Sequence, residues 1–165
     1  MQSELYWVNG RWPGKLALSA RPRGRDWLSD EIGGWKREGV NSVLSLLTAE
    51  EERELDLTNE ANESRRQGLR YFSFPIPDRQ VPQSEAKFNA VLTQVSEDLS
   101  DGKNVLVHCR QGVGRTGLVA ACLLIRGGMS SGAAVEAVSA ARGVAIPETS
   151  EQRDWIEHYA PALTK

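Results

Sequence analysis

Residues 108–117 read His108-Cys109-Arg110-Gln111-Gly112-Val113-Gly114-Arg115-Thr116-Gly117, and they join a short apolar run to a longer one. The preceding run, residues 105–107, has the composition of a buried parallel strand. The following run, residues 118–125, is apolar on every side, which predicts a buried helix. A strand, a glycine-containing loop and a helix in this order are typical of an anion site, because the loop N–H groups and the positive end of the helix dipole converge there.

Strand-like and helix-like segments alternate on both sides of this loop. Strands are predicted at residues 15–20, 42–47, 69–74 and 105–107, and helices at residues 26–38, 84–100, 116–126, 130–141 and 151–159. The alternation predicts an α/β fold with a mostly parallel central sheet and helices on both faces. The loop then lies at the carboxyl end of a strand, where such sheets bind ligands. The length fits one domain over residues 1–165.

The side chains of the loop suit attack by sulfur on a phosphate ester. Loop amides, a helix end and Arg115 would stabilise a thiolate at Cys109, since such surroundings lower the pKa of a cysteine from about 8.5 to roughly 3.5–7.5. The planar guanidinium of Arg115 can bind two phosphate oxygens at once. Gly112 and Gly114 permit positive φ and close approach of the backbone to phosphate. Thr116 could donate its hydroxyl to Cys109 and make the sulfur a better leaving group.

The segment resembles the Cys-x5-Arg-Ser/Thr signature of the protein tyrosine phosphatase superfamily, including the preceding His108 and the following Gly117. Looser features are similar to its small, dual-specificity-like branch and to the kinase-associated phosphatases. The resemblance implies a single cysteine-phosphatase-like domain that forms a phosphocysteine intermediate. It implies no cofactor and no metal, because the arginine and the amides supply the positive field. The phosphate would be bound by the loop residues Arg110, Gln111, Gly112, Val113, Gly114 and Arg115.

A proline-rich segment upstream, residues 74–82, carries the candidate general acid. The departing ester oxygen needs a proton, and the family's acid occupies a comparable loop, so Asp78 is predicted to supply it. The alternative is that Asp78 only caps a turn. Glu85 and the acidic run near Glu50 are the other candidate acids.

A third segment, residues 142–152, precedes the last predicted helix. In the larger tyrosine-specific members of the family, a glutamine here positions the water that hydrolyses the phosphocysteine. That glutamine falls on Glu148 in this chain, and Gln152 matches a second, more structural glutamine. Water positioning could therefore pass to Gln152, to Asp78 acting as a base, or to no dedicated residue. Gln152 is equally compatible with a plain position on a helix face.

The remaining histidine and cysteine residues suggest structural roles. We expect the His108 ring to be buried and to hydrogen-bond the loop backbone, which would tune Cys109 indirectly. Cys122, within the apolar helix, is expected to be structural, and oxidation of Cys109 should give a sulfenic acid or its backbone adduct before a disulfide. Two histidines and two cysteines at these spacings do not suggest a zinc site.

Two charged clusters have more than one interpretation. The basic cluster, Arg21, Arg23 and Arg25, is either a solvated loop or a contact for a second phosphate or an acidic flank. The acidic residues within 50–54 and 56–63 are predicted to form a solvated helix face.

Composition narrows the class of protein. A formal net charge of −2 argues against a general nucleic-acid binder. Two cysteines form no disulfide framework, which fits a reducing compartment. The first residues lack an apolar signal core and no run could span a membrane. We therefore expect a cytoplasmic monomer whose partner is a phosphorylated protein or peptide, without nucleic-acid or membrane binding.

The predicted activity is hydrolysis of phosphotyrosine in proteins, with phosphoserine and phosphothreonine left open because the sequence does not give the depth of the pocket. Phosphoinositides or other non-protein phosphate monoesters are the nearest alternative, although the loop lacks the paired lysines that lipid phosphatases of this superfamily often carry. A phosphoprotein-binding pseudophosphatase and a rhodanese-type sulfurtransferase are further alternatives. The sulfurtransferase would leave Asp78 and Thr116 without a role.

Overall fold

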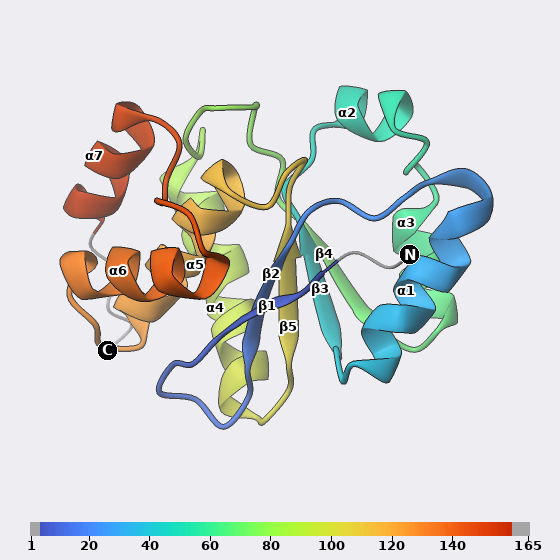
Figure 1. Ribbon diagram of the computed structural model, residues 1–165, viewed down its shortest axis with the longest axis horizontal. Coiled ribbons are helices and arrows are strands. Elements are labelled where there is room, and N and C mark those ends of the chain that lie inside the picture. Colours follow the sequence, from blue (N-terminus) through green and yellow to red (C-terminus); the bar gives the residue numbers. More distant parts are fainter. Residues whose placement is uncertain (1–3, 160–165) are drawn as a thin grey trace.

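The computed structural model describes residues 4–159, which form a central sheet between two layers of helices (Figure 1). The sheet has five strands in the order β1-β2-β5-β3-β4. Their bounds are Tyr6–Val8 for β1, Leu16–Ser19 for β2, Val105–His108 for β5, Ser42–Ser45 for β3 and Arg70–Ser73 for β4. All neighbours pair in parallel except β1, which pairs antiparallel with β2. The predicted α/β fold with a mostly parallel sheet is confirmed, and β1 is an addition to it.

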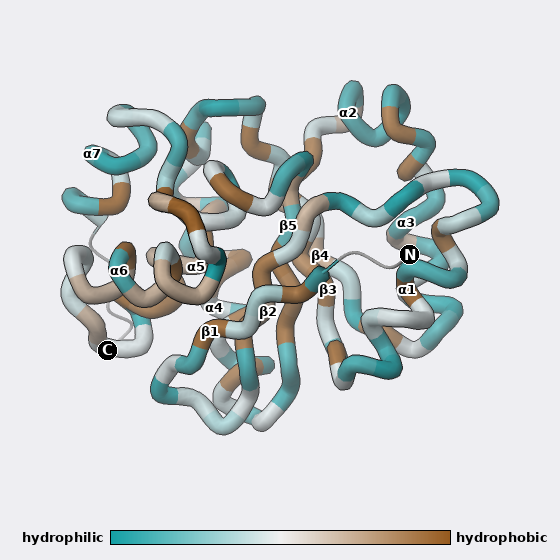
Figure 2. The backbone as a smooth tube through the Cα atoms, viewed as in Figure 1, coloured by the Kyte–Doolittle hydropathy of each residue, from teal (hydrophilic) through white to brown (hydrophobic). Residues whose placement is uncertain are grey.

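The helices cover both faces of the sheet. A 3₁₀ turn, Arg25–Trp27, leads into α1, and the α-helices are α1 (Leu28–Arg37), α2 (Ala49–Glu54), α3 (Glu60–Arg66), α4 (Glu85–Ser100), α5 (Gly114–Arg126), α6 (Ser131–Arg142) and α7 (Ser150–His158). In Figure 1, α1 and α3 lie on one side of the sheet and α4, α5 and α6 on the other. Hydrophobic residues concentrate at the centre of the molecule, along the strands (Figure 2). Within residues 4–159, no helix is both long enough and apolar enough to cross a membrane.

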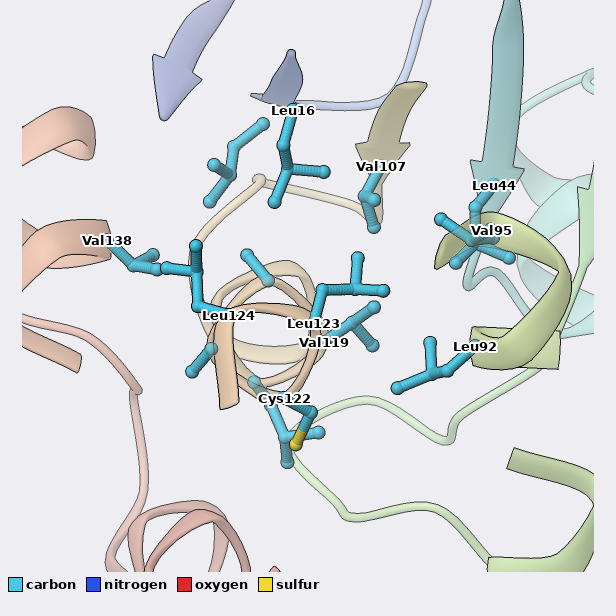
Figure 3. Close-up of a cluster of buried hydrophobic side chains, with 14 of the residues drawn as sticks. Leu16, Leu44, Leu92, Val95, Val107, Val119, Cys122, Leu123, Leu124 and Val138 are labelled. Carbon is cyan, nitrogen blue, oxygen red and sulfur yellow. The ribbon is translucent and has the colours of Figure 1, made fainter. Parts of the chain in front are cut away.

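Successive side chains of β5 point to opposite faces of the sheet, and the hydrophobic core is accordingly divided into two parts. Val105 and Val107 belong to the cluster formed with α4, α5 and α6, whereas Leu106 belongs to the cluster formed with α1. In Figure 3, Val107 faces Val119 and Leu123 of α5. This is the period of two expected for a strand that is buried on both faces.

Cys122 lies within the larger part of the core (Figure 3). Its side chain is fully buried, and burial raises the pKa of its thiol well above the ordinary value. The predicted structural role of Cys122 is therefore confirmed.

The parallel strands all end at the same edge of the sheet. The segments that follow β2, β3, β4 and β5 therefore meet there, although they lie far apart in the sequence (Figure 1). They include the loop after His108, the turn that starts α2, and the proline-rich segment between β4 and α4. This edge is where ligands bind in sheets of this kind.

Phe88 on α4 connects the start of the proline-rich segment to α7. Its ring packs against Phe74, Trp155 and Tyr159, with centroid separations of 5.4, 5.1 and 5.8 Å. We predict that Phe88→Ala lowers the free energy of unfolding by about 3–5 kcal/mol, because a large buried ring leaves a cavity that the structure fills only in part. Urea denaturation measures the change, and Val144→Ala, at a position 45% exposed, is the control. A loss below about 1 kcal/mol would contradict the packing described here.

Candidate active site

A pocket of about 120 Å³ opens at the carboxyl edge of the sheet. It is lined by Asp78, Arg79, Cys109, Arg110, Gln111, Arg115 and Glu148. The structure thus brings together five of the predicted site residues from two distant segments. Arg79 and Glu148 are additions to the predicted set, and the side chain of Gln152 is not part of the lining.

Cys109 lies at the start of the loop that follows β5. It is 3% exposed, and its Sγ accepts a hydrogen bond of 3.3 Å from the backbone N–H of Gly112. Gly112 has φ of +76°, and a Cβ there would lie 2.5 Å from the carbonyl oxygen of Ser19. Only glycine fits such a position, so the backbone that reaches the sulfur depends on Gly112.

Arg115, in the first turn of α5, lines the pocket and is almost fully buried. Its Nη1 and Nη2 donate to the two carboxylate oxygens of Glu51 at 2.7 and 2.9 Å, and Nη1 also donates to the carbonyl oxygen of Ile76 at 2.8 Å. Nη2 lies 3.3 Å from Oδ1 of Asp78.

Glu51 is positioned by the start of α2. Its N–H donates to Oγ1 of Thr48, and the N–H of Thr48 donates to its carboxylate, which together form a capping box. Burial alone would raise the pKa of Glu51. The hydrogen bonds from Arg115 and from the Thr48 N–H, with the nearby charge of Arg115, outweigh burial and lower the pKa from 4.5 to about 2. Glu51 is therefore ionised at neutral pH and cannot be the general acid.

The prediction of a solvated acidic face over residues 50–63 is wrong for two carboxylates. Glu51 is 7% exposed and Glu60 is fully buried, each beside a basic side chain from the segment 108–115. The Thr48-x-x-Glu51 pattern of a capping box was the one signal in the sequence that could have singled out Glu51.

Asp78 projects from the segment between β4 and α4. Its side chain is 58% exposed, and its ion-pair partner within residues 4–159 is Arg115. Glu85 begins α4 and does not line the pocket. Of the three predicted candidates for the acid, Asp78 alone is placed at the pocket in an exposed position.

Gln152 fastens the Asp78 segment to α7. It is fully buried, its Oε1 accepts from the N–H groups of Glu148 and Thr149 at 3.2 and 3.3 Å, and its Nε2 donates to the carbonyl oxygen of Gln80 at 3.1 Å. The interpretation as a plain helix-face residue is therefore wrong. Gln152 supports the site through the backbone and not through the pocket lining.

Glu148 forms the wall of the pocket opposite the Asp78 segment. Its Oε2 lies 3.6 Å from Nη1 of Arg79, so an ion pair bridges the two segments. A Cβ on Gly114 would lie 2.3 Å from Oε1 of Glu148. Gly114 therefore makes room for Glu148. It does not have the positive φ that was predicted for it, because it already belongs to α5.

The other predicted loop residues support the site from behind. The ring of His108 is fully buried as expected, but its Nε2 hydrogen-bonds Oε2 of Glu60 at 2.6 Å and not the loop backbone. The hydroxyl of Thr116 is buried and has no hydrogen-bond partner within residues 4–159, so its predicted bond to Cys109 is not formed here. Val113 packs against the core. The absence of a side chain at Gly117 leaves room for Ile146, because a Cβ on Gly117 would lie 2.3 Å from Cγ2 of Ile146.

Comparison with known proteins agrees with this geometry. Residues 19–129 match the family model described as polymorphic toxin system, DSP-PTPase phosphatase. The chain belongs to the DSP-PTPase phosphatase family. The predicted resemblance is thereby confirmed.

Two curated relatives share part of their length with this phosphatase chain. It is 25% identical over 130 residues to cyclin-dependent kinase inhibitor 3 of Rattus norvegicus, covering 78% of this chain and 61% of the relative. It is 37% identical over 98 residues to the Arabidopsis thaliana protein named phosphatidylinositol 3,4,5-trisphosphate 3-phosphatase and protein-tyrosine-phosphatase PTEN1, covering 55% and 23%. The chain thus spans about three fifths of the first relative and less than a quarter of the second.

Solved structures share the fold. The crystal structure of kinase associated phosphatase, with its catalytic-site cysteine substituted by serine, superposes with a TM-score of 0.87 at 21% identity and covers 94% of this chain and 93% of that one. The structure of Tk-PTP in its active form gives a TM-score of 0.76 at 26% identity, with 94% and 97% covered.

Arg142 is a supporting residue that the sequence did not reveal. From the end of α6, its Nε donates to the carbonyl oxygen of Gly112 at 3.1 Å and its Nη2 to that of Gln111 at 3.3 Å. Its guanidinium carbon lies 4.1 Å from the centre of the Tyr6 ring on β1. The edge strand β1, which was not predicted, therefore contacts an arginine that hydrogen-bonds the backbone of the phosphatase loop.

The predicted basic cluster does not line the pocket. Arg23 pairs with buried Glu31 at 3.0 Å, and Arg25 pairs with Asp56 at 2.7 Å. Within residues 4–159, no three side chains of the His, Cys, Asp and Glu types form a group that could hold a metal.

Glu51→Gln tests the pair with Arg115. At neutral pH the unfolding free energy should fall by about 3 kcal/mol, since a buried cation loses its counter-charge, and kcat/KM should fall at least roughly tenfold as Arg115 loses its orientation. Because folding lowers the pKa of Glu51 from 4.5 to about 2, the stabilisation by this carboxylate is present above pH 4.5 and is lost as pH falls towards 2.

Urea unfolding at pH 7, 4 and 2.5 measures the loss of stability and its dependence on pH, and steady-state kinetics measure kcat/KM. The variant should lose less stability than the parent between pH 4.5 and 2, and Glu50→Gln, an exposed neighbour on α2, is the control. If the parent and Glu51→Gln lost equal stability on acidification, the acid-sensitive stabilisation could not come from the Glu51 carboxylate.

Proposed function

We propose that this chain is a metal-independent phosphatase that hydrolyses phosphate monoesters in proteins through a phosphocysteine intermediate. One observation carries the proposal: the sulfur of Cys109 and the guanidinium of Arg115 share a small pocket, and each is held by a hydrogen bond that fixes its orientation. This transfer requires a nucleophile that can reach phosphorus and an oriented cation that binds the non-bridging oxygens.

In the first step, the thiolate of Cys109 attacks phosphorus and the bond from phosphorus to the ester oxygen breaks. Arg115 and the N–H groups of residues 110–115 bind the non-bridging oxygens. Asp78 gives its proton to the departing oxygen, so the product leaves as a neutral alcohol or phenol. The exposure of Asp78 at the pocket mouth supports this role, because the leaving group must also lie there.

In the second step, water attacks the phosphocysteine. The Asp78 carboxylate accepts a proton from this water, the sulfur–phosphorus bond breaks, and inorganic phosphate and the Cys109 thiolate are released. The hydroxyl of Thr116, which is buried without a partner among the described residues, is free to hydrogen-bond the departing sulfur. The side chain of Gln152 does not line the pocket and is bound to backbone groups of Glu148, Thr149 and Gln80, which favours Asp78 as the group that positions water.

The charges around the pocket favour a protein substrate over a polyanionic lipid head group. Arg79 pairs with Glu148, and Arg110 pairs with Glu51 at 3.3 Å and Glu54 at 2.9 Å. A head group with several phosphates would need cations that are not already paired. Kinase associated phosphatase, whose fold this chain shares, also supports a phosphoprotein substrate. Phosphoinositide hydrolysis is the second candidate, because it appears in the name of the Arabidopsis relative.

The pocket walls favour dual specificity. No aromatic side chain is among the seven residues that line the pocket in the described chain, and most of the lining is charged. A phosphotyrosine ring would therefore find no apolar slot that phosphothreonine lacks. We infer that both phosphoamino acids are substrates.

The deciding experiment compares kcat/KM for matched peptides that differ only in phosphotyrosine or phosphothreonine. We predict values within about tenfold of each other, since no pocket contact worth more than roughly 1.4 kcal/mol distinguishes the two. Soluble phosphatidylinositol 3,4,5-trisphosphate is the comparison substrate and should be slower. Cys109→Ser should lower turnover by at least roughly 10⁴-fold while peptide binding persists. Substantial turnover by this variant would rule out the phosphocysteine.

Asp78→Asn should separate substrates by their leaving groups. An amide cannot donate the proton, so the rate for a phosphopeptide should fall by roughly 10²–10³-fold, whereas an activated aryl phosphate should lose much less. Steady-state kinetics on both substrates measure the contrast, with Asp101→Asn, on the turn after α4, as the control. Equal losses on both substrates would remove Asp78 from the acid role.

A further inference from the structure

A second and larger hollow, of about 570 Å³, lies between the end of β4 and α4, and we call it the β4–α4 groove. Most of the residues that line it are exposed, so the groove is open to solvent. The two-step scheme uses none of them. They are Ser73, Phe74, Pro75, Gln83, Ser84, Lys87, Ala90 and Val91.

The floor of the β4–α4 groove is apolar. Phe74 is buried, Val91 is half-buried, and Pro75 and Ala90 lie beside them. The Phe74 ring packs against Phe88 with 5.4 Å between the ring centroids, which holds this part of the floor in place. An apolar side chain that entered the groove would therefore leave water for a surface that is already formed.

The strand beside the groove has a free edge. β4 is the last strand in the sheet order, and in the described chain it pairs with β3 alone. The N–H of Arg70 donates to the carbonyl oxygen of Asn41, on the β3 side. Because the direction of the backbone groups alternates along a strand, those of Tyr71 and Ser73 point to the free edge. An extended chain can hydrogen-bond to them as one further strand.

Lys87 determines the charge of a fitting partner. It is exposed, and it is the one charged residue among the eight that line the groove, so the groove favours a carboxylate. Lys87 and Val91 lie four residues apart on α4, which corresponds to about 6 Å along the helix. Two residues of a strand span about 6.7 Å and place their side chains on the same face. The groove therefore fits an apolar side chain and a carboxylate two residues apart on an extended chain.

The groove adjoins both ends of the segment that carries Asp78. Pro75 lies near the start of this segment, and Gln83 and Ser84 end it before α4. Three residues separate Pro75 from Asp78 along the chain, so their Cα atoms lie within about 11 Å of each other. One polypeptide can therefore occupy the groove and present a phosphorylated side chain to the catalytic pocket.

We propose that the β4–α4 groove binds an extended segment of the phosphoprotein substrate. The segment adds to the free edge of β4, buries an apolar side chain against Phe74 and Val91, and pairs a carboxylate with Lys87. This inference deepens the proposed function and rests on it for the statement that the occupant is the substrate. A small amphipathic carboxylate would use the floor and Lys87 but not the free edge.

Binding is tested without turnover, with blocked, unphosphorylated peptides of the sequences TVTET and TETVT, which cover both chain directions. In nitrogen-15 spectra, at least one of them should shift the amide signals of Tyr71 and Ser73 and slow their hydrogen exchange. Replacing glutamate by lysine in the same peptide should weaken binding by about threefold to fivefold, the size of one exposed ion pair. Lys87→Glu should reverse this preference.

Two matched variants on α4 test the location. Ala90→Arg fills the groove and should raise the Kd of the acidic peptide at least roughly tenfold. Ala86→Arg places the same side chain at another exposed position of α4, outside the lining, and should leave the Kd unchanged. Absence of shifts at Tyr71 and Ser73 with both acidic peptides, or equal binding by Ala90→Arg and the parent, would overturn the proposal.

Other occupants have distinct signatures. Shifts of the Tyr71 and Ser73 signals on raising the protein concentration alone would assign the edge to a second copy of this chain. Shifts of the groove signals with octanoate but with neither acidic peptide would assign the groove to a small amphiphile. Either result would overturn the proposal.

Kinetics test whether the occupant is the substrate. A phosphotyrosine peptide joined through four glycines to the acidic sequence that binds, on its N-terminal or C-terminal side, should have a KM about tenfold below that of a peptide with glycine and serine in its place. The kcat should not change, and Ala90→Arg should remove the difference. Equal KM values in the parent would overturn the assignment to substrate. Absence of turnover on every phosphate monoester would refute the proposed function alone, because the binding spectra need no chemistry.

Discussion

The pair between Arg115 and Glu51 joins three elements that the chain brings together from distant positions. The guanidinium at the start of α5 donates twice to the carboxylate of α2 and once to the carbonyl oxygen of Ile76, which leads to Asp78. Because the guanidinium is only 2% exposed, removing either partner would leave a buried charge without compensation. In the proposed reaction the cation is therefore oriented before phosphate binds, and little reorganisation is needed.

Glu51 can orient Arg115 because its own position is set locally. The capping box with Thr48 fixes the first turn of α2 and turns the carboxylate towards the sheet edge. The same carboxylate also accepts from Nε of Arg110 at 3.3 Å. The short helix α2, of six residues, thus places two carboxylates, Glu51 and Glu54, beside the basic side chains of the loop and of α5.

Sequence reasoning succeeded where the signal is local. In the four parallel strands and the longer helices, apolar residues recur with the period expected of a strand or a helix. The candidate catalytic residues of the loop lie within a single stretch of ten residues. It failed for Glu51 and Glu60, whose partners lie 64 and 48 residues away, so composition could not separate them from exposed neighbours. Arg142 and Gln152 act on loop backbone through tertiary contacts and leave no motif. The edge strand β1 has only three residues, of which Val8 alone is buried.

Four basic side chains of the site are each paired with a carboxylate: Arg115 with Glu51, Arg110 with Glu54, Arg79 with Glu148 and His108 with Glu60. Under the proposed function, the pocket of a chain with a net charge of −2 would therefore bind an anion without an excess of unpaired cations. The attraction comes from oriented N–H groups and the end of α5, which act over a few ångströms, and not from a long-range positive field. Such a pocket recognises the shape of a phosphate but gives little steering at a distance. Under the proposed function, the contacts that bring a protein substrate to the pocket would therefore lie on the surrounding surface.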